Sequence, residues 1–320
     1  MSATGASRRL GYPARGGAVS ELERAYAHCH EVVAARAKNF IYAFKLLPPA
    51  RRRGLEAIYA YCRVADDFAD DDGIPSAERA RKLSDLRQRV RCALLGGEGP
   101  REPEPELDLM CLALQDTARR FGVSHEDLDA VAVGCEQDLV KARYATWQEL
   151  RDYCYLVASC VGLACLDVFG YRGPRERARE LATDLGLAMQ LTNVIRDVRE
   201  DVERDRIYLP QDELERFGID EEQLRAGRVD DAWRRFASFQ VARARELYAR
   251  AEPLFSVVRR RSRICPIALA TIYGAVLERV EAVDYDVFSE RASLSGNEKL
   301  ALLGLSVGKT ALSAPFSVSD

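Results

Sequence analysis

The sequence predicts an all-α protein with a single domain. Ala, Leu, Arg and Glu, which favour helices, dominate the chain, and the period-two alternation typical of half-buried strands is scarce. Of the 320 residues, 48% are hydrophobic, which is enough for a large core. Prolines and glycines divide the chain into segments of helical length. We therefore expect one helical bundle, or two helical halves that are tightly fused.

Breaks in the apolar pattern define the expected helices. Residues 22–46 form a first helix or pair of helices, which Pro48 and Pro49 stop. Ser124 has the Ser-x-x-acidic form of a helix start. The longest apolar stretch, residues 153–169, is shorter than the roughly 20 residues of a membrane span and predicts a buried central helix. Further helices are expected at residues 51–71, 77–95, 107–121, 128–139, 147–169, 175–199, 230–259 and 266–283, with loops at 96–105 and 205–210.

The two ends of the chain differ in composition from its middle. Residues 1–20 are rich in Gly, Ser and Arg without an apolar core, and predict a disordered tail rather than a signal peptide. The helical domain is expected to cover residues 21–295. Residues 296–320 are moderately apolar with few charges, and predict a segment that lies on the core or on a bilayer surface.

Charge and cysteine usage limit the partners of the protein. The 47 basic and 50 acidic residues are well mixed and give a net charge of −3, so we expect no nucleic-acid partner. The nine cysteines are odd in number and contain no C-x-x-C pair, which is typical of small core residues in a reducing compartment. We therefore expect a cytoplasmic protein without a disulfide framework or a zinc site.

Two acidic clusters, with Asp66 and Asp197 131 residues apart, are the most informative feature of the chain. Residues three or four apart share one face of a helix, so each cluster presents two carboxylates one turn apart. Such a pair destabilises an isolated helix by roughly 0.2–0.5 kcal/mol, and a hard divalent cation would compensate the repulsion. Because Mg²⁺ takes its remaining ligands from phosphates and water, two facing stripes could hold a diphosphate. The stripes consist of Tyr59, Arg63, Asp66 and Asp70, and of Gln190, Asn193, Asp197 and Asp201.

A solvated helix face is the ordinary interpretation of a single Asp-x-x-x-Asp pattern. Apolar residues surround both stripes, however, so neither helix is polar on all sides. Gln190 and Asn193 lie inside an apolar run, where an unpaired amide costs a few kcal/mol. We therefore expect these two amides to have partners.

Four segments together resemble the squalene/phytoene synthase family of head-to-head prenyl transferases. They are Tyr59-x-x-x-Arg63-x-x-Asp66-x-x-x-Asp70, Tyr153-Cys-Tyr-Leu-Val-Ala-Ser-Cys-Val-Gly162, Gln190-x-x-Asn193-x-x-Arg196-Asp197-x-x-x-Asp201 and Arg206-Ile-Tyr-Leu-Pro210. The similarity spans residues 37–291. It implies the isoprenoid-synthase fold, a single-domain helical bundle with a central apolar cavity and the acidic stripes facing each other across its mouth.

The resemblance also implies a reaction and a metal site. The metal ligands would be Asp66, Asp70, Asp197 and Asp201, assisted by Asn193, and would bind Mg²⁺, with Mn²⁺ as the alternative ion. The ions would polarise the diphosphate of a prenyl substrate until it leaves an allylic cation. Arg63 and Arg196 would donate to phosphate oxygens. The double bond of a second substrate would then close a cyclopropylcarbinyl diphosphate in a dry channel. Asp66→Ala or Asp197→Ala is expected to abolish turnover without weakening the fold.

Aromatic and small residues complete the implied site. Tyr59, Tyr153 and Tyr273 would stabilise cations with their ring faces, near Gln190, with core packing as the alternative for each ring. Ala158 and Gly162 would keep the central helix slim, so that either a prenyl chain or another helix lies against it.

One segment departs from the family pattern. Where relatives carry Ser-x-Ser-Phe to contact diphosphate, this chain has Ala37-Lys38-Asn39-Phe40, so both hydroxyls are missing. The positive charge of Lys38 and the amide of Asn39, next to Phe40, are expected to make the contact instead.

The product is expected to have 30 carbons. Residues 157–162 resemble the squalene-forming bacterial branch, which predicts condensation of two farnesyl diphosphates to presqualene diphosphate, and possible reduction to squalene. The alternative is a phytoene synthase that condenses two geranylgeranyl diphosphates. Remote alternatives are a helical protein that binds a prenyl lipid or a divalent metal without turnover, and a non-catalytic subunit of a synthase.

Two further partners depend on this product. The sequence contains no G-x-G-x-x-G turn after a strand, so the use of NADPH stays open. Without reduction, a downstream pathway enzyme would finish the conversion. Because such products are insoluble in water, peripheral contact with the inner face of a membrane is also expected.

Overall fold

The computed structural model describes residues 20–36, 43–100 and 102–312, and the side chains of these residues up to 306. In this part of the chain the regular structure is helical, and strand-like pairing is limited to two isolated bridges, Arg143 with Ile207 and Tyr171 with Val258. The all-α prediction is thus confirmed. The helices are α1 Glu21–Arg36, α3 Pro49–Asp70, α4 Ser76–Leu95, α5 Pro105–Phe121, α6 His125–Gln137, α7 Trp147–Cys154, η1 Tyr155–Ser159, α8 Cys160–Phe169, α9 Arg175–Arg196, α10 Val198–Glu203, α11 Gln211–Phe217, α12 Glu221–Arg225, α13 Asp231–Ala251, α14 Leu254–Val257, α15 Arg260–Ala282 and α16 Gly296–Leu312.

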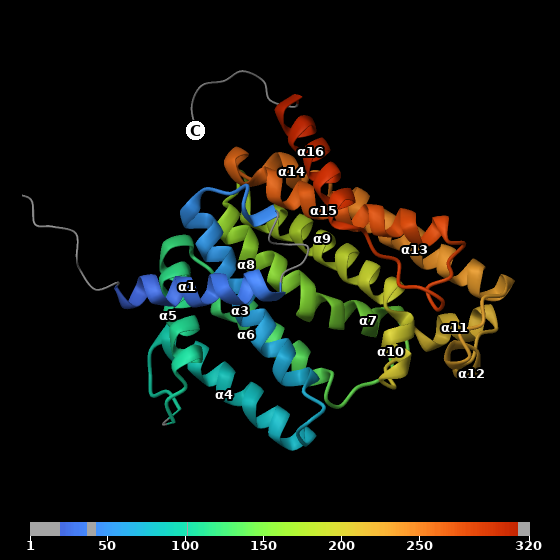
Figure 1. Cartoon of the computed structure of the whole chain (residues 1–320), viewed down its shortest axis with the longest axis horizontal. Helices are drawn as coiled ribbons and strands as arrows, with labels where there is room; N and C mark the ends of the chain where they lie inside the picture. The colour runs from blue at the N-terminus through green and yellow to red at the C-terminus, as the bar shows by residue number, and fades with distance from the viewer. Residues whose placement is uncertain (1–19, 37–42, 101, 313–320) are drawn as a thin grey trace, which may run out of the picture.

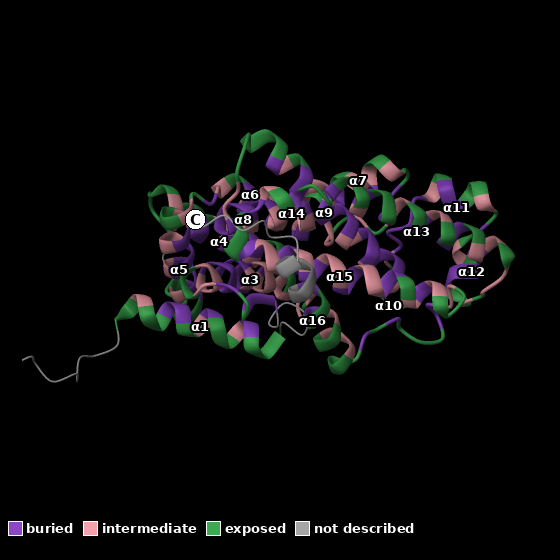
Figure 2. Cartoon of the chain, turned by 90° about the horizontal axis from the view of Figure 1, so that it is seen from above, coloured by how far each residue is buried: buried purple, intermediate pink, exposed green. Residues whose placement is uncertain are grey.

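Helix α9 occupies the centre of the bundle (Figure 1). It packs against α13, α8, η1 and α15. Its first half, residues 178–185, belongs to a hydrophobic cluster with α1, α3, α5 and α6, and its second half, residues 187–195, belongs to a cluster with α7 and α13. Figure 2 shows the corresponding buried faces along the inner helices. The two apolar clusters therefore share one helix, which joins the halves into a single bundle.

Helix α3 carries the first acidic stripe and begins at Pro49, two residues before the expected start at residue 51. Pro49 occupies the first turn, where the missing N–H of proline would have no helical partner anyway. Fully buried Tyr61 anchors the middle of the helix by donating its hydroxyl hydrogen to the Leu128 carbonyl oxygen at 2.7 Å. This bond ties α3 to α6, so the stripe has a fixed position relative to the bundle.

The predicted buried central helix is also confirmed. α7, η1 and α8 form one continuous helix over residues 147–169, which is long and apolar enough to span a membrane by length and composition. More than half of its apolar window is buried inside the protein, where it packs against α9, α6 and α3. Its middle turn, Tyr155–Ser159, is π-helical.

Several helix boundaries differ from the expectation. The helix expected over residues 230–259 ends at Ala251, and the separate short helix α14 follows it. The helix predicted over residues 175–199 bends at Asp197, whose φ of −99° and ψ of 12° separate α9 from α10. α15 begins at Arg260 rather than at Pro266, which lies inside the helix and costs only one backbone hydrogen bond there. The short helices α11 and α12 follow the predicted loop and were not expected, because five to seven residues give too little apolar pattern.

Helix α16 runs antiparallel to α15. The ion pair of Arg279 with Glu298 joins the start of α16 to the end of α15. Nearer the start of α15, the Thr271 hydroxyl oxygen lies 3.3 Å from the Ser306 hydroxyl oxygen of α16. Leu303 is buried in this contact, whereas Leu300 and Leu305 are exposed. Residues 296–306 therefore pack on α15, and contact of the C-terminal segment with a bilayer stays a prediction.

Candidate active site

Two cavities meet inside the bundle, one polar and one apolar. The apolar cavity has a volume of about 270 Å³ and the polar cavity a volume of about 250 Å³. They share four lining residues, Asp66, Val157, Gln190 and Asn193. The structure thus places the predicted acidic stripes next to the predicted apolar cavity.

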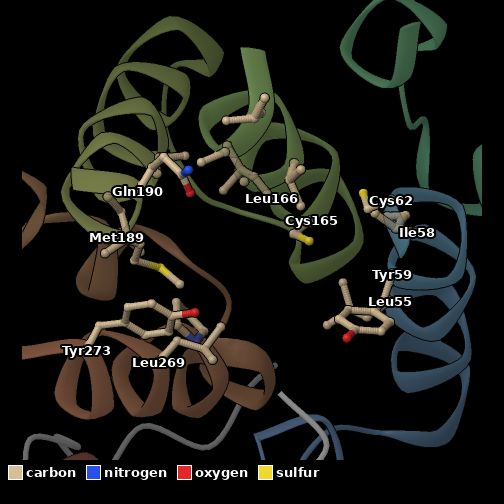
Figure 3. Close-up of a pocket in the computed structure, with 18 of the residues that line it drawn as sticks. Leu55, Ile58, Tyr59, Cys62, Cys165, Leu166, Met189, Gln190, Leu269 and Tyr273 are labelled. Atoms are coloured by element: carbon tan, nitrogen blue, oxygen red, sulfur yellow. The ribbon is translucent and has the colours of Figure 1, made fainter. Parts of the chain in front are cut away.

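The apolar cavity is a tube between four helices. Its wall comes from α3, the central helix, α9 and α15, with Phe44 and Leu254 added from loops and short turns (Figure 3). On α3 the lining runs from Leu55 to Asp66, and on α9 from Ala182 to Asn193, which is a span of 11 residue steps in each case. Because a helix rises 1.5 Å per residue, the tube extends about 16 Å away from the polar cavity. Its remote end, called here the far end, is lined by Leu55, Phe169, Ala182, Leu254 and Pro266.

Two of the predicted aromatic residues face each other across this tube. Tyr59 comes from α3 and Tyr273 from α15, and both side chains point into the cavity beside Gln190 and Met189 (Figure 3). Burial raises the pKa of Tyr59 to about 12, so its phenol is neutral at physiological pH. A neutral ring offers a cation its negative face without an anionic oxygen that would react with it.

Ala158 and Gly162 line the same tube, as the slim-helix prediction requires. The π-helical turn next to them is enclosed by two glycines. A Cβ on Gly134 would lie 2.6 Å from the Val157 side chain, and a Cβ on Gly186 would lie 2.5 Å from the Ser159 Cα. Only glycine allows this close approach, so the two neighbouring helices hold the turn in place and keep Val157 at the junction of the cavities.

The polar cavity gathers five carboxylates. Asp66 and Asp70 come from α3, and Asp197 and Asp201 from the bend between α9 and α10. Across the bend the hydrogen bonds continue, from the Asp197 N–H to the Asn193 carbonyl and from the Asp201 N–H to the Asp197 carbonyl, both at 2.9 Å. The second stripe therefore keeps one face although its helix is not straight. The fifth carboxylate is Asp138, at the end of α6.

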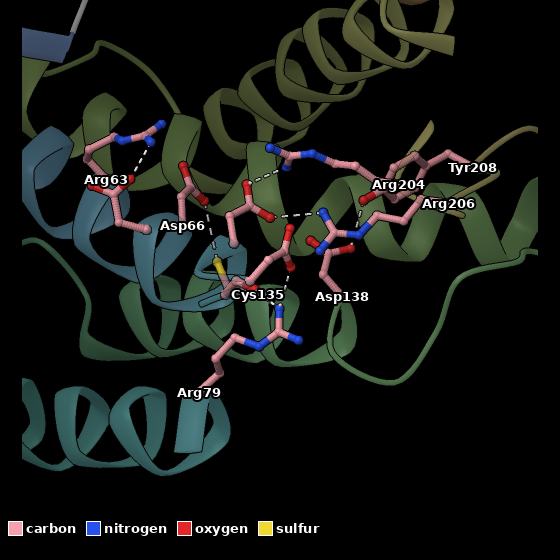
Figure 4. Close-up of polar contacts among 12 residues, drawn as sticks. Arg63, Asp66, Arg79, Cys135, Asp138, Arg204, Arg206 and Tyr208 are labelled. Carbon is pink, nitrogen blue, oxygen red and sulfur yellow. Dashed lines mark hydrogen bonds and ion pairs between the residues drawn. The ribbon is translucent and has the colours of Figure 1, made fainter. Parts of the chain in front are cut away.

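Arginines neutralise one carboxylate in each stripe. Asp70 accepts from Arg206 at 2.9 Å and lies 3.3 Å from Arg204 (Figure 4). Asp197 accepts from the Nε atoms of Arg196 at 2.6 Å and Arg291 at 2.8 Å. Burial acts to raise the pKa of Asp197, but the two arginines outweigh burial and hold this pKa below its usual value.

The other carboxylate of each stripe has no such ion pair among the described residues. Burial, aided by neighbouring carboxylates, raises the pKa of Asp66 to about 7 and that of Asp201 to about 8. The Asp66 side chain keeps accessible surface, and this surface faces the polar cavity. The Cys135 thiol lies 3.5 Å from the Asp66 carboxylate. The charges of Arg63 at Asp66 and of Arg206 at Asp201 offset burial only in part, and a bound cation would supply the remaining counter-charge.

Asp138 is a polar-cavity residue that the sequence did not predict. The hydroxyl groups of Tyr153 and Tyr208 donate to it at 2.8 and 2.9 Å, and burial raises its pKa to about 6. The Tyr153 ring stacks on Tyr208 with centroids 5.2 Å apart. Tyr153 therefore lines the polar cavity and holds a carboxylate with its hydroxyl, and its expected role in stabilising cations stays a prediction. No spacing rule singles out one aspartate at a helix end.

The amides predicted to need partners do interact. Asn193 donates from Nδ2 to Gln190 Oε1 at 3.1 Å, while Asn193 Oδ1 is buried and has no hydrogen-bond partner among the described residues. An orphaned buried oxygen beside carboxylates suits a hard cation such as Mg²⁺ or Mn²⁺. Among the described residues, no three His, Cys, Asp or Glu side chains converge to hold an ion by themselves. The oxygen ligands thus fit ions that share their coordination with a diphosphate and water.

Two predicted phosphate donors do not line either cavity. Arg63 is hydrogen-bonded to Asp67, and Arg196 is bound to its neighbour Asp197. Arg204 and Arg206 line the polar cavity instead. The sequence had marked Arg206 only as part of a matching segment and gave Arg204 no role. Lys38, Asn39 and Phe40 lie outside the described residues.

An all-α bundle with an acidic cavity that opens into an apolar tube is the architecture of a prenyltransferase. The family model of squalene/phytoene synthase matches residues 33–298 of this chain. The chain belongs to the squalene/phytoene synthase family and is a prenyltransferase. The resemblance seen in the sequence is confirmed.

Relatives and solved structures agree with this membership. The chain is 36% identical over 302 residues to phytoene synthase 2 of Solanum lycopersicum, covering 93% of this chain and 94% of the relative. It is 36% identical over 296 residues to 15-cis-phytoene synthase of Synechococcus elongatus, covering 89% and 93%. Among solved structures, a dehydrosqualene synthase superposes with a TM-score of 0.81 at 26% identity, covering 91% and 98%. Squalene synthase HpnC from Alicyclobacillus acidocaldarius superposes with a TM-score of 0.74 at 28% identity, covering 83% and 96%.

The expectation of presqualene diphosphate from two farnesyl diphosphates is wrong. Phytoene synthases of plants and a cyanobacterium match this chain at 36–38% identity over most of its length. The expectation rested on residues 157–162, several of which line the tube near the polar cavity. These residues form only one part of the wall, whereas the far end, where the length of a prenyl chain is limited, is also lined by Leu55, Leu254 and Pro266 from other helices, so residues 157–162 carry little information on product size.

Proposed function

We propose that this protein is a phytoene synthase, which condenses two molecules of geranylgeranyl diphosphate to phytoene. The observation that supports it most is the joint lining of the two cavities by Asp66, Val157, Gln190 and Asn193. This junction allows a diphosphate to lie among carboxylates and arginines while its prenyl chain lies in the tube. The identity to phytoene synthases favours the C20 substrate.

The first half of the proposed reaction ionises one substrate. Asp66, Asp70, Asp197 and Asp201, with the free oxygen of Asn193, would hold Mg²⁺ or Mn²⁺. Such ions supply Lewis-acid polarisation of the diphosphate leaving group when bound. Arg204 and Arg206 reach the same cavity and would bind phosphate oxygens there. The C–O bond breaks, the electron pair leaves with the diphosphate, and an allylic cation remains at the junction.

The second half joins the two chains in the tube. The 2,3 double bond of the second substrate attacks the cation, and loss of one proton closes a cyclopropylcarbinyl diphosphate. Departure of the second diphosphate, rearrangement and loss of another proton give phytoene, so the balance needs no hydride donor. The faces of Tyr59 and Tyr273 would stabilise the cations, and the apolar wall would keep water from quenching them.

Product analysis tests this proposal. The purified chain is incubated with Mg²⁺ and geranylgeranyl diphosphate, with and without NADPH, and the extracted products are identified by mass spectrometry. We expect a C40 hydrocarbon with the mass of phytoene, in which a conjugated triene joins the two prenyl chains. It should form equally well without NADPH, and two diphosphates should be released for each product molecule. Retention of intact substrate, with diphosphate unreleased, would contradict the proposal and support a binding protein.

A further inference from the structure

Arginines gather on the surface that covers the far end of the apolar tube. We call this surface the basic cap. It is formed by the segments that follow α8 and α14 and by the first turn of α3, and its residues are Arg51, Arg172, Arg259, Arg260 and Arg261.

Backbone pairing joins these segments directly outside the tube. The Arg172 N–H donates to the Val257 carbonyl oxygen and the Arg259 N–H to the Gly170 carbonyl oxygen, both at 2.9 Å. Arg51 crosses from α3 and donates to the Phe169 carbonyl oxygen at 2.6 Å. Because Phe169 lines the far end of the tube, the cap is the layer of protein between the tube and the surface at this end.

Four arginines of the cap have no carboxylate partner among the described ion pairs. Arg172, Arg259, Arg260 and Arg261 are exposed. Of the described ion pairs, none joins Arg51, Arg259, Arg260 or Arg261 to a carboxylate, whereas Arg52 and Arg53 have Glu56 and Glu23 as partners. Burial, and then the charges of Arg259 and Arg261, lower the pKa of Arg51, which indicates that like charges lie close together. In a chain with a net charge of −3, this cluster is a local exception.

The polar cavity and the cap lie at opposite ends of α3. Arg51 and Asp70 are 19 residues apart on this helix, which corresponds to about 28 Å. Lys45 and Leu46, both exposed, precede α3 next to its cap end. The molecule therefore has one end that suits Mg²⁺ and diphosphate in water, and another end with positive charge over an apolar interior.

We propose that the basic cap docks the protein onto a bilayer that contains anionic phospholipids, with the far end of the tube toward the membrane and the acidic cavity toward water. This docking rests on the proposed function, because substrates and products with long apolar chains partition into bilayers. Arginines near an anionic surface are attracted to its negative potential, and the attraction is screened within a Debye length. A nucleic acid would meet the same cap, but the acidic remainder of the chain disfavours it.

Vesicle sedimentation of the full chain tests this docking. The variant Arg259→Gln/Arg260→Gln/Arg261→Gln is compared with the matched control Arg234→Gln/Arg245→Gln/Arg250→Gln. The control removes the same charge from exposed arginines that have the carboxylate partners Asp284, Glu281 and Asp184. We expect the unmodified chain to bind phosphatidylglycerol-containing vesicles more tightly than pure phosphatidylcholine vesicles, the cap variant to lose about 10- to 100-fold in partitioning, and the control to lose much less. Raising the salt concentration should weaken binding of the unmodified chain.

Several results would overturn the docking. They are absence of binding to anionic vesicles, equal losses in the two triple variants, binding retained by the cap variant, and binding to RNA in place of vesicles. Thermal melting checks that both variants fold. Turnover of detergent-dispersed geranylgeranyl diphosphate separates the two proposals: the cap variant should keep this activity, and an inactive chain that still binds vesicles through the cap would contradict only the proposed function.

Discussion

The two acidic stripes are built on the same plan with the order reversed. On α3 the first carboxylate, Asp66, has no ion pair within the described part of the chain, and the second, Asp70, is bound by two arginines. At the α9–α10 bend the first, Asp197, is bound by two arginines, and the second, Asp201, has no ion pair with a described residue. Each stripe therefore offers one carboxylate that is already neutralised and one that needs a cation.

This difference assigns two roles to the four carboxylates. The pair bound by arginine is positioned within the site, and the other pair is suited to bind metal ions. An arginine pair holds each of Asp70 and Asp197 in place before any ligand arrives. The raised pKa values of Asp66 and Asp201 mean that a metal ion would gain most from these two, because their charge is otherwise costly. The comparison predicts that mutations within one stripe have unlike effects on stability.

The largest effect is expected at the carboxylates without an ion pair. Asp66→Asn and Asp201→Asn should each lower kcat by about 10³-fold, because a ligand of the leaving-group site is lost. The metal-free melting temperature should stay equal or rise, since an uncompensated charge disappears. Diphosphate release and thermal melting measure the two quantities, and exposed Asp71→Asn is the control. A marked drop in melting temperature would refute the distinction.

Asp197→Asn should act on the fold as well as on turnover. Arg196 keeps only 13% of its side chain exposed and would lose the charge of its main partner, so we expect the free energy of unfolding to fall by up to about 3 kcal/mol. This corrects the expectation from sequence that removing one of two repelling carboxylates leaves stability unchanged. Urea unfolding of the metal-free protein measures the loss. Equal free energies of unfolding for Asp197→Asn and Asp66→Asn would show that the ion pairs of Asp197 with its two arginines do not stabilise the fold.

The metal-free protein should become less stable as pH rises. Asp66 and Asp201 have pKa values of about 7 and 8 in the folded chain, above the usual value of about 4 in an unfolded chain. Between these limits the unfolded chain releases its protons first, so stability present at pH 5 is lost progressively toward pH 8. Melting curves across this range check the sign, and they should flatten in Asp66→Asn/Asp201→Asn. An increase in stability with pH would show that Asp66 and Asp201 do not determine the pH dependence of stability.

The smallest effect is expected at Arg204. Its side chain is half exposed, and its pairing with Asp70 is of the surface type, so Arg204→Gln should raise KM by about 5-fold with little change in kcat. Binding of inorganic diphosphate with Mg²⁺, measured by calorimetry, should weaken in parallel. Arg177→Gln, an exposed arginine on α9 paired with Glu180, is the control. An unchanged diphosphate affinity would remove Arg204 from the site.

Local patterns predicted most of the helices and the metal-binding candidates. Helix α3 and the central helix follow from proline stops and apolar runs, and the stripes follow from residues spaced three or four apart. The Asp197 bend escaped prediction, because Val198 and the residues around it continue a helical pattern. The π-helical turn also escaped, since it depends on Gly134 and Gly186 from two other helices.

By itself, the sequence determined the fold class, the family and four of the five carboxylates of the polar cavity, because these depend on residue type and on spacing within one helix. Only the tertiary structure decided which aspartates are paired with arginine, the place of Asp138 beside Tyr153, and the length of the tube. Such features arise where segments that are far apart in the chain pack against each other, because this packing determines both the charge pairs and the volume of the cavity. The capacity of the tube for a prenyl chain is therefore a property of packed helices, which no single stretch of residues encodes.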